Sequence, residues 1–145
     1  MLPPATITTH SFSDAGGAPF AFTQLAGKWV LVASDSGECP AACVEKLTTL
    51  RQVRLALGRN AERVERVLVI DDLRRPDPAV LKDFAGTAIV LTPPGLQLPP
   101  GAVNDRAHIY LVDPRGNVMM RWAAGADRKR MLADLQRLLK ASQIG

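Results

Sequence analysis

Residues 29–58 read WVLVASDSGECPAACVEKLTTLRQVRLALG, and this stretch decides the fold. It opens on a continuous apolar run, Trp29 to Ala33, which is typical of a strand covered on both faces. After the cysteines, apolar residues recur at helical spacing as far as Gly58, where the pattern stops. The stretch therefore predicts a buried strand that leads into a helix, with two cysteines at the junction.

The chain contains two cysteines, Cys39 and Cys43, spaced one helical turn apart. If the helix runs from Pro40 onward, Cys39 is its N-cap and Cys43 lies in the first turn, so both sulfurs project from the same end. Unpaired N–H groups and the helix dipole favour thiolates at this end, although the charge of Glu38 opposes them. The spacing predicts a reactive pair that forms a reversible disulfide or holds one metal ion. The alternative is an inert pair: two buried cysteines or a static disulfide.

The segments on either side of this junction alternate between strand and helix. Apolar stretches around turn residues 13–17 predict a hairpin within Ile7 to Leu25. A strand is expected over Val64 to Ile70 and a short helix over Pro78 to Phe84. The prolines and glycines between Thr92 and Gly101 predict an exposed loop.

The last third of the chain predicts a hairpin and a helix. Strands are expected over His108 to Val112 and Asn117 to Trp122, joined by the turn Asp113 to Gly116. Asp127 is expected to cap a final helix with one apolar face. The fold class is therefore α/β: a mixed central sheet flanked by helices, with an N-terminal hairpin and a C-terminal hairpin plus helix, as in thioredoxin-like proteins.

Composition excludes several classes of protein. A chain of 145 residues fits one domain, 1–145, and we interpret residues 1–6 as a linker remnant. The net charge of +4 is not accompanied by a nucleic-acid-binding module or by stacking aromatic residues, so we expect no nucleic-acid partner. No window is apolar for long enough to span a membrane, and no signal segment opens the chain.

The sequence resembles the Sco (SenC) family, whose members carry a C-P-x-x-C motif in a thioredoxin fold. The motif is Cys39 to Cys43 here. The strand before it, Ala26 to Val32, is similar to the family's, as are the segments Val69 to Asp72, Asp77 to Lys82 and Tyr110 to Gly116. These segments come in the family's order and cover most of the chain, from about Ile7 to Leu139.

The resemblance implies a copper site formed by Cys39, Cys43 and His108. Thiolates suit Cu(I), and imidazole nitrogen suits both Cu(I) and Cu(II). It also implies a metallochaperone rather than an enzyme: a monomeric accessory factor for cytochrome c oxidase assembly, acting on the copper-bearing subunit or on another copper carrier. The expected location is the periplasmic side of the inner membrane, reached through an upstream N-terminal anchor.

The sequence departs from the family pattern at two places. Ala41 and Ala42 occupy the motif positions where the family usually has an acidic residue. The family histidine commonly precedes the tyrosine by about five residues, whereas His108 precedes Tyr110 by two and Asp105 has the usual spacing. Because side chains alternate along a strand, these two positions point to opposite faces, and a shortened loop would be needed to aim His108 at the cysteines. His10 is interpreted as a surface residue.

Two further functions stay open. One is a thiol–disulfide oxidoreductase acting on a subunit of a respiratory complex, with Cys39 as the attacking thiol and Cys43 as the resolving thiol. The other is a non-catalytic thioredoxin-like interaction domain that docks partners through the loop Thr92 to Gly101.

Overall fold

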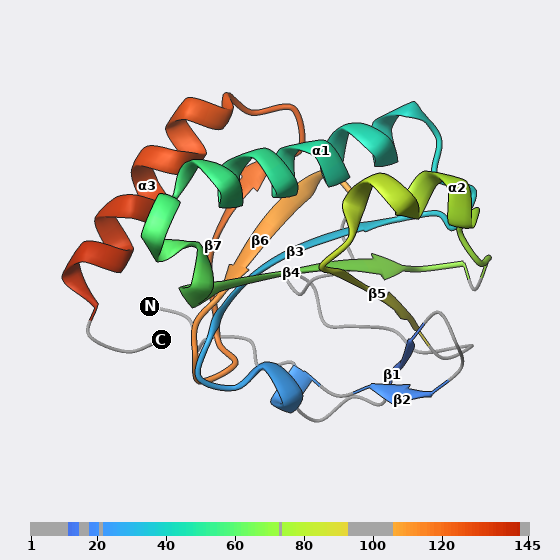
Figure 1. The fold of residues 1–145 in the computed structure, drawn as a ribbon, viewed down its shortest axis with the longest axis horizontal. Helices are drawn as coiled ribbons and strands as arrows, with labels where there is room; N and C mark the ends of the chain where they lie inside the picture. Colours follow the sequence, from blue (N-terminus) through green and yellow to red (C-terminus); the bar gives the residue numbers. More distant parts are fainter. Residues whose placement is uncertain (1–11, 15–17, 21, 73, 93–105, 143–145) are drawn as a thin grey trace.

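The computed structural model describes residues 12–14, 18–20, 22–72, 74–92 and 106–142 (Figure 1). Its strands are β1 (Phe12–Asp14), β2 (Pro19–Phe20), β3 (Trp29–Asp35), β4 (Val64–Ile70), β5 (Thr87–Leu91), β6 (His108–Val112) and β7 (Val118–Ala123). Its α-helices are α1 (Ala41–Ala56), α2 (Pro78–Leu81) and α3 (Arg128–Ala141). Three 3₁₀ segments, η1 (Phe22–Leu25), η2 (Gly58–Arg63) and η3 (Lys82–Phe84), complete the described elements.

The strands form one mixed sheet in the order β2-β1-β5-β4-β3-β6-β7. The central strands β3, β4 and β5 are parallel, and their register pairs Trp29 with Val64 and Arg66 with Thr87. Strand β6 is antiparallel to β3, and β7 is antiparallel to β6. This arrangement confirms the predicted thioredoxin-like α/β fold with a mixed sheet and a C-terminal hairpin.

The predicted N-terminal hairpin is present but extends the sheet. Strand β1 pairs antiparallel with β2 on one side and with β5 on the other. Strand β5 was not predicted from the sequence. Its five residues, TAIVL, follow Gly86 as a short apolar run. Without an adjacent hairpin turn, the periodicity of so short a run does not distinguish a strand from a buried helix segment.

The two faces of the sheet bury different sets of side chains. Helices α1 and α3 lie together on one face (Figure 1), where their apolar side chains meet residues such as Leu31, Leu68 and Leu111. The opposite face buries a smaller cluster that includes Val32, Val67 and Tyr110. Because neighbours along a strand point to opposite faces, successive buried apolar residues alternate between the two clusters, as Trp29, Leu31 and Ala33 do with Val30 and Val32.

Some predicted features lie outside the described residues: the linker 1–6, His10, Asp105 and most of the loop that was expected over Thr92 to Gly101. In the described part of the chain, no helix is long and apolar enough to cross a membrane.

Candidate thiol and metal site

Cys39 and Cys43 form a disulfide, with their Cα atoms 4.9 Å apart. Both belong to the cluster beneath the helices, where Cys39 is 7% exposed and Cys43 is fully buried. Of the two residues, Cys39 is the slightly more exposed. The intramolecular bond agrees with the one-turn spacing in the sequence.

The helix begins one residue later than predicted. Pro40 is the N-cap of α1, so Cys39 precedes the helix, and Cys43 lies in its first turn. No side chain caps this end, and the first turn contains no acidic residue. Cys39 has a φ of 46°, and its N–H donates to the Ser36 carbonyl. The backbone thus turns sharply before the helix and brings Cys39 back over the first turn.

A buried ion pair lies close to the cysteines. Asp35 is the last residue of β3, and Lys46 is on α1, three residues after Cys43. The Lys46 ammonium donates to the Asp35 carboxylate and to the Ser34 carbonyl, each at 2.9 Å. Both side chains are about 95% buried, so the pair joins the end of the strand to the start of the helix beneath the cysteine loop.

Asp72 organises the loop between β3 and the cysteines. Its carboxylate accepts hydrogen bonds from the Ser36 hydroxyl, the Gly37 N–H and the Arg74 N–H. A Cβ on Gly37 would collide with the Arg74 carbonyl. The loop before the cysteines and the loop after β4 are therefore in close contact and hydrogen-bonded to each other. Arg74 also forms an ion pair with Glu38, the residue before Cys39.

A further ion pair ties the approach to β6 to the same end of the sheet. Arg106 donates to Asp71 through Nε and Nη2, which is a bidentate contact. This hydrogen-bonded carboxylate, together with the charges of Asp35 and Asp72, raises the pKa of Arg106 even though burial opposes the shift. The segment that leads into His108 is thus fixed two residues before it.

His108 is the first residue of β6, and it pairs with Ala123 of β7. Its ring lies 6.2 Å from the ring of Tyr110, and Tyr110 belongs to the cluster on the face opposite the cysteines. The structure brings Cys39 and Cys43 together, whereas His108 shares the face of Tyr110. Within the described residues, no group of three or more His, Cys, Asp or Glu side chains is arranged to hold a metal ion.

We did not predict from the sequence that Asp35, Lys46 and Asp72 lie near the cysteines. A lysine within an amphipathic helix normally predicts an exposed side chain, so Lys46 gave no local sign of burial. The positions of Asp71 and Asp72 did indicate that they lie near the cysteines. They directly follow a buried strand, at the edge of the sheet where the cysteine loop also begins.

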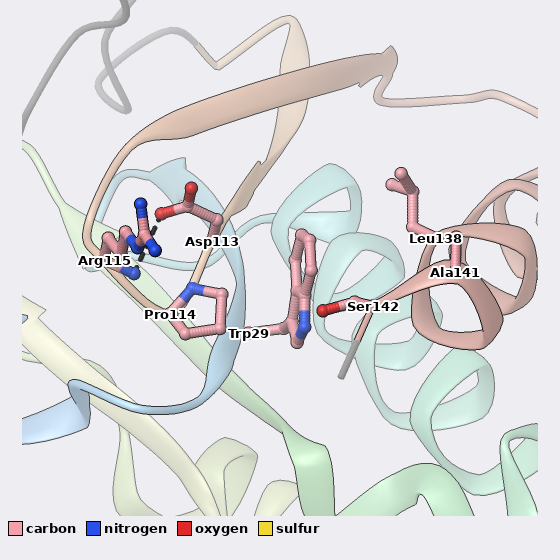
Figure 2. A pocket seen from close by; sticks show the side chains of 7 residues that line it. All are labelled: Trp29, Asp113, Pro114, Arg115, Leu138, Ala141 and Ser142. Atoms are coloured by element: carbon pink, nitrogen blue, oxygen red, sulfur yellow. Dashed lines mark hydrogen bonds between the residues drawn. The ribbon is translucent and has the colours of Figure 1, made fainter. Parts of the chain in front are cut away.

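A pocket of about 370 Å³ lies at the other end of β3 (Figure 2). It is lined by Trp29, by Pro114 and Arg115 of the β6–β7 turn, and by the end of α3 near Leu138. It contains no cysteine or histidine, so it is not part of the thiol site.

The arrangement can perform two kinds of chemistry. Oxidised, it is a buried disulfide; reduced, it offers two thiolates at a helix N-terminus, suited to thiol exchange or to a soft cation such as Cu(I). Fold and site together define a thioredoxin-like domain with a paired-cysteine centre.

Comparison with known proteins identifies the family. The family model described as "Transmembrane-like, thioredoxin-like, C-terminal domain" matches residues 29–142, and the chain belongs to this family. No curated protein sequence matches the chain.

Solved structures of Sco proteins share the fold. Copper-bound ScoI from Arabidopsis thaliana is 16% identical with a TM-score of 0.74, covering 92% of this chain and 97% of its own. Apo Sco1 from Thermus thermophilus is 22% identical with a TM-score of 0.73, covering 95% and 94%. BsSco, a Sco-family cytochrome c oxidase assembly protein with a disulfide switch, is 15% identical with a TM-score of 0.66, covering 92% of each chain.

Proposed function

We propose that this protein is a copper-binding and thiol-redox factor for the assembly of cytochrome c oxidase. The observation that carries the proposal is the Cys39–Cys43 pair at the start of α1, in a fold shared with copper-bound Sco structures. Copper is the cargo in this proposal, and the copper-bearing oxidase subunit or another copper carrier is its source or recipient.

The reduced cysteines fit Cu(I). Two thiolates one helical turn apart give a soft donor pair, and Cu(I) accepts such a pair without a third ligand. Cu(II) with thiolate ligation generally takes nitrogen as well, and His108 is the candidate donor. Because His108 shares the face of Tyr110, it reaches the sulfurs in this proposal only when the start of β6 leaves its pairing with Ala123.

Copper titration tests the site. Reduced protein is titrated with Cu(I) and Cu(II), and sulfur-to-copper absorption is followed for Cu(II). We expect Cys39→Ser and Cys43→Ser each to abolish tight Cu(I) binding. His108→Ala should weaken Cu(II) binding by at least about tenfold, because losing a ligand costs no less than losing one of its outer-shell partners, while the disulfide still forms. Equal Cu(II) affinity in wild type and His108→Ala would remove histidine from the site.

A second candidate function is thiol–disulfide exchange, favoured by the disulfide itself and by the greater exposure of residue Cys39 than of Cys43. In this reaction the Cys39 thiolate attacks a partner disulfide and releases one partner thiolate. The Cys43 thiolate then attacks the Cys39 sulfur, which re-forms the internal disulfide and releases the second partner thiolate. The protein is oxidised by two electrons and the partner is reduced.

Trapping separates the two functions. If exchange is the function, Cys43→Ser should accumulate a mixed disulfide with a partner through Cys39, and Cys39→Ser should accumulate much less. Mass spectrometry of the trapped species measures the difference. A pure metal site predicts similar loss of copper binding from both substitutions and no such asymmetry.

We also propose that the domain faces an oxidising compartment, the periplasmic side of the inner membrane, and is held there by an anchor outside this sequence. A disulfide in a small domain persists in such a compartment and is rare in a reducing cytosol. A fusion of the full-length natural protein to alkaline phosphatase, active only when exported, checks this location.

A further inference from the structure

A buried arginine lies beneath the C-terminal half of α1, away from the cysteines. Arg66 of β4 is 8% exposed, and its strand position places it on the helix-covered face, in line with Val64 and Leu68. Its Nη2 donates to the Ala85 carbonyl at 3.3 Å. Among the described residues its Nε has no hydrogen-bond partner. A buried cation without a carboxylate partner is costly and calls for a counter-charge.

A second unpartnered group lies beside it. Thr87 of β5 is the register partner of Arg66, is 9% exposed, and its hydroxyl also has no hydrogen-bond partner in the described part of the chain. The absence of a side chain at Gly86 leaves room for the Arg66 guanidinium, since a Cβ at that position would lie 2.5 Å from Arg66 Nη2. Two buried polar groups without hydrogen-bond partners therefore lie on paired residues of β4 and β5, on the helix-covered face of the sheet.

Two more arginines come from α1. Arg51 Nη1 donates to the Asp83 carbonyl at 2.9 Å, and its guanidinium lies over the Phe84 ring. Arg54 Nε donates to the Val64 carbonyl at 2.7 Å. Within the described residues neither forms an ion pair, so backbone carbonyls are their polar partners.

Neighbouring charges affect the pKa of Arg66. Burial is the main cause that lowers the pKa of Arg66, and the positive charges of Arg54 and Arg51 lower it further, while Glu65 opposes them. Glu65 is the neighbour of Arg66 along the strand, and adjacent strand residues point to opposite faces. The helix-covered side of this region is therefore left with three positive charges.

We propose that Arg66, Arg54 and Arg51, together with the Thr87 hydroxyl, form a binding site for a phosphate-type oxyanion. The planar guanidinium fork matches the oxygens of such a group, and a doubly charged anion balances several cations better than a single carboxylate does. The hydroxyl of Thr87 supplies a neutral donor. This site is separate from the cysteines and does not depend on the proposed copper or thiol function.

Thermal unfolding with inorganic phosphate tests the proposal. Phosphate replaces chloride at constant ionic strength, which holds general screening fixed. We expect a saturable rise in Tm for the wild type, because a ligand that binds only the folded state stabilises it. Arg54→Gln and Arg51→Gln should each weaken phosphate binding about tenfold, the effect of one lost charge-assisted hydrogen bond.

Two variants sharpen this test. Arg59→Gln, an exposed arginine of η2, makes the same charge change nearby and should leave the phosphate response intact. Arg66→Met should be at least as stable as wild type without phosphate, because an apolar side chain replaces an unpaired buried charge, and should not respond to phosphate. If Arg66→Met does not fold, the phosphate responses of Arg54→Gln and Arg51→Gln test the proposal. No saturable phosphate effect in wild type, or equal losses in Arg59→Gln and Arg54→Gln, would overturn the site.

Vesicles identify the source of the phosphate group. Phosphatidylcholine vesicles with and without phosphatidic acid are sedimented with the protein. A lipid headgroup as ligand predicts co-sedimentation that requires phosphatidic acid, is competed by inorganic phosphate and is weakened in Arg54→Gln but not in Arg59→Gln. A free phosphate compound predicts the Tm response without co-sedimentation. Vesicle binding that Arg59→Gln weakens as much as Arg54→Gln would instead reflect the net charge and would count against a specific site.

Discussion

Asp72 holds the loop before the cysteines through hydrogen bonds that only its charged form accepts fully. Burial would raise the pKa of Asp72, but hydrogen bonds from the Gly37 N–H, the Ser36 hydroxyl and the Arg74 N–H lower it below its usual value. A carboxyl group with a lowered folded-state pKa stabilises the protein above its unfolded pKa, about 3.9, and this contribution is lost as the pH falls through the folded value.

We therefore expect the Asp72→Asn variant to be less stable than wild type by about 1.5–3 kcal/mol at neutral pH, the range for hydrogen bonds to a charged group. Wild type should lose stability as the pH falls below about 4, and the variant should lose less over the same range. Urea unfolding across this range measures both. Asp83→Asn, which removes an exposed carboxylate, is the control for net charge. Parallel pH profiles for wild type and Asp72→Asn would contradict the role given to Asp72.

The contact between the two cysteines could be predicted from the local sequence. The pairing of Cys39 with Cys43 follows from one-turn spacing at a helix start, and the structure contains that disulfide. The burial of Lys46 and Arg66 did not follow from local pattern, because each depends on a partner or neighbour far away in the sequence: Asp35 for Lys46, and the strand pairing with Thr87 for Arg66.

At the scale of elements, β5 is the strand that was not predicted, although β6 has the same length and was predicted beside the turn Asp113 to Gly116. Strands β3 and β4 and helix α1 have enough apolar residues in sequence for the pattern to identify them, whereas β5 has five residues and is defined by its pairing with β4 and β1. The direction of His108 depends on strand parity. Two residues apart on one strand, His108 and Tyr110 share a face, but which face of the sheet this is depends on the pairing of β6 with β3 and β7, which is not evident from the sequence.

The contact between the β3–α1 loop and the loop after β4 gives a prediction for these elements. Gly37→Ala places a methyl group against the Arg74 carbonyl, so the two loops must separate. We expect a loss of roughly 1–3 kcal/mol, the range for overpacking. The Cys39–Cys43 disulfide should also react faster with added thiol, because its loop loses support.

Gly125→Ala is the matched control, since a Cβ there meets no atom within 4 Å. Urea unfolding and the rate of reaction with dithiothreitol measure the two effects. Equal behaviour of the Gly37 and Gly125 variants would show that the loops do not support each other.

For the whole molecule, the sheet and its two apolar clusters provide most of the stability, and the disulfide lies at one end of them. The chain-entropy relation assigns about 2 kcal/mol to a cross-link that closes so short a loop. Cys39 has a left-handed φ of 46°, which costs an L-residue roughly 1–2 kcal/mol. We expect reduction to let Cys39 leave this conformation, so that the lost cross-link and the relieved strain offset each other and the two forms differ little in stability.

We therefore expect the reduced protein to remain folded, with a Tm within a few degrees of the oxidised form, as about 1 kcal/mol predicts for a domain of this size. Such a small difference suits a redox pair, because either state can then be reached without unfolding the domain. Thermal unfolding with and without a phosphine reductant measures the shift, and the double variant Cys39→Ser/Cys43→Ser should match the reduced form. Loss of cooperative unfolding on reduction would mean that the disulfide holds the fold together, which would favour a static structural cross-link over a redox or copper site.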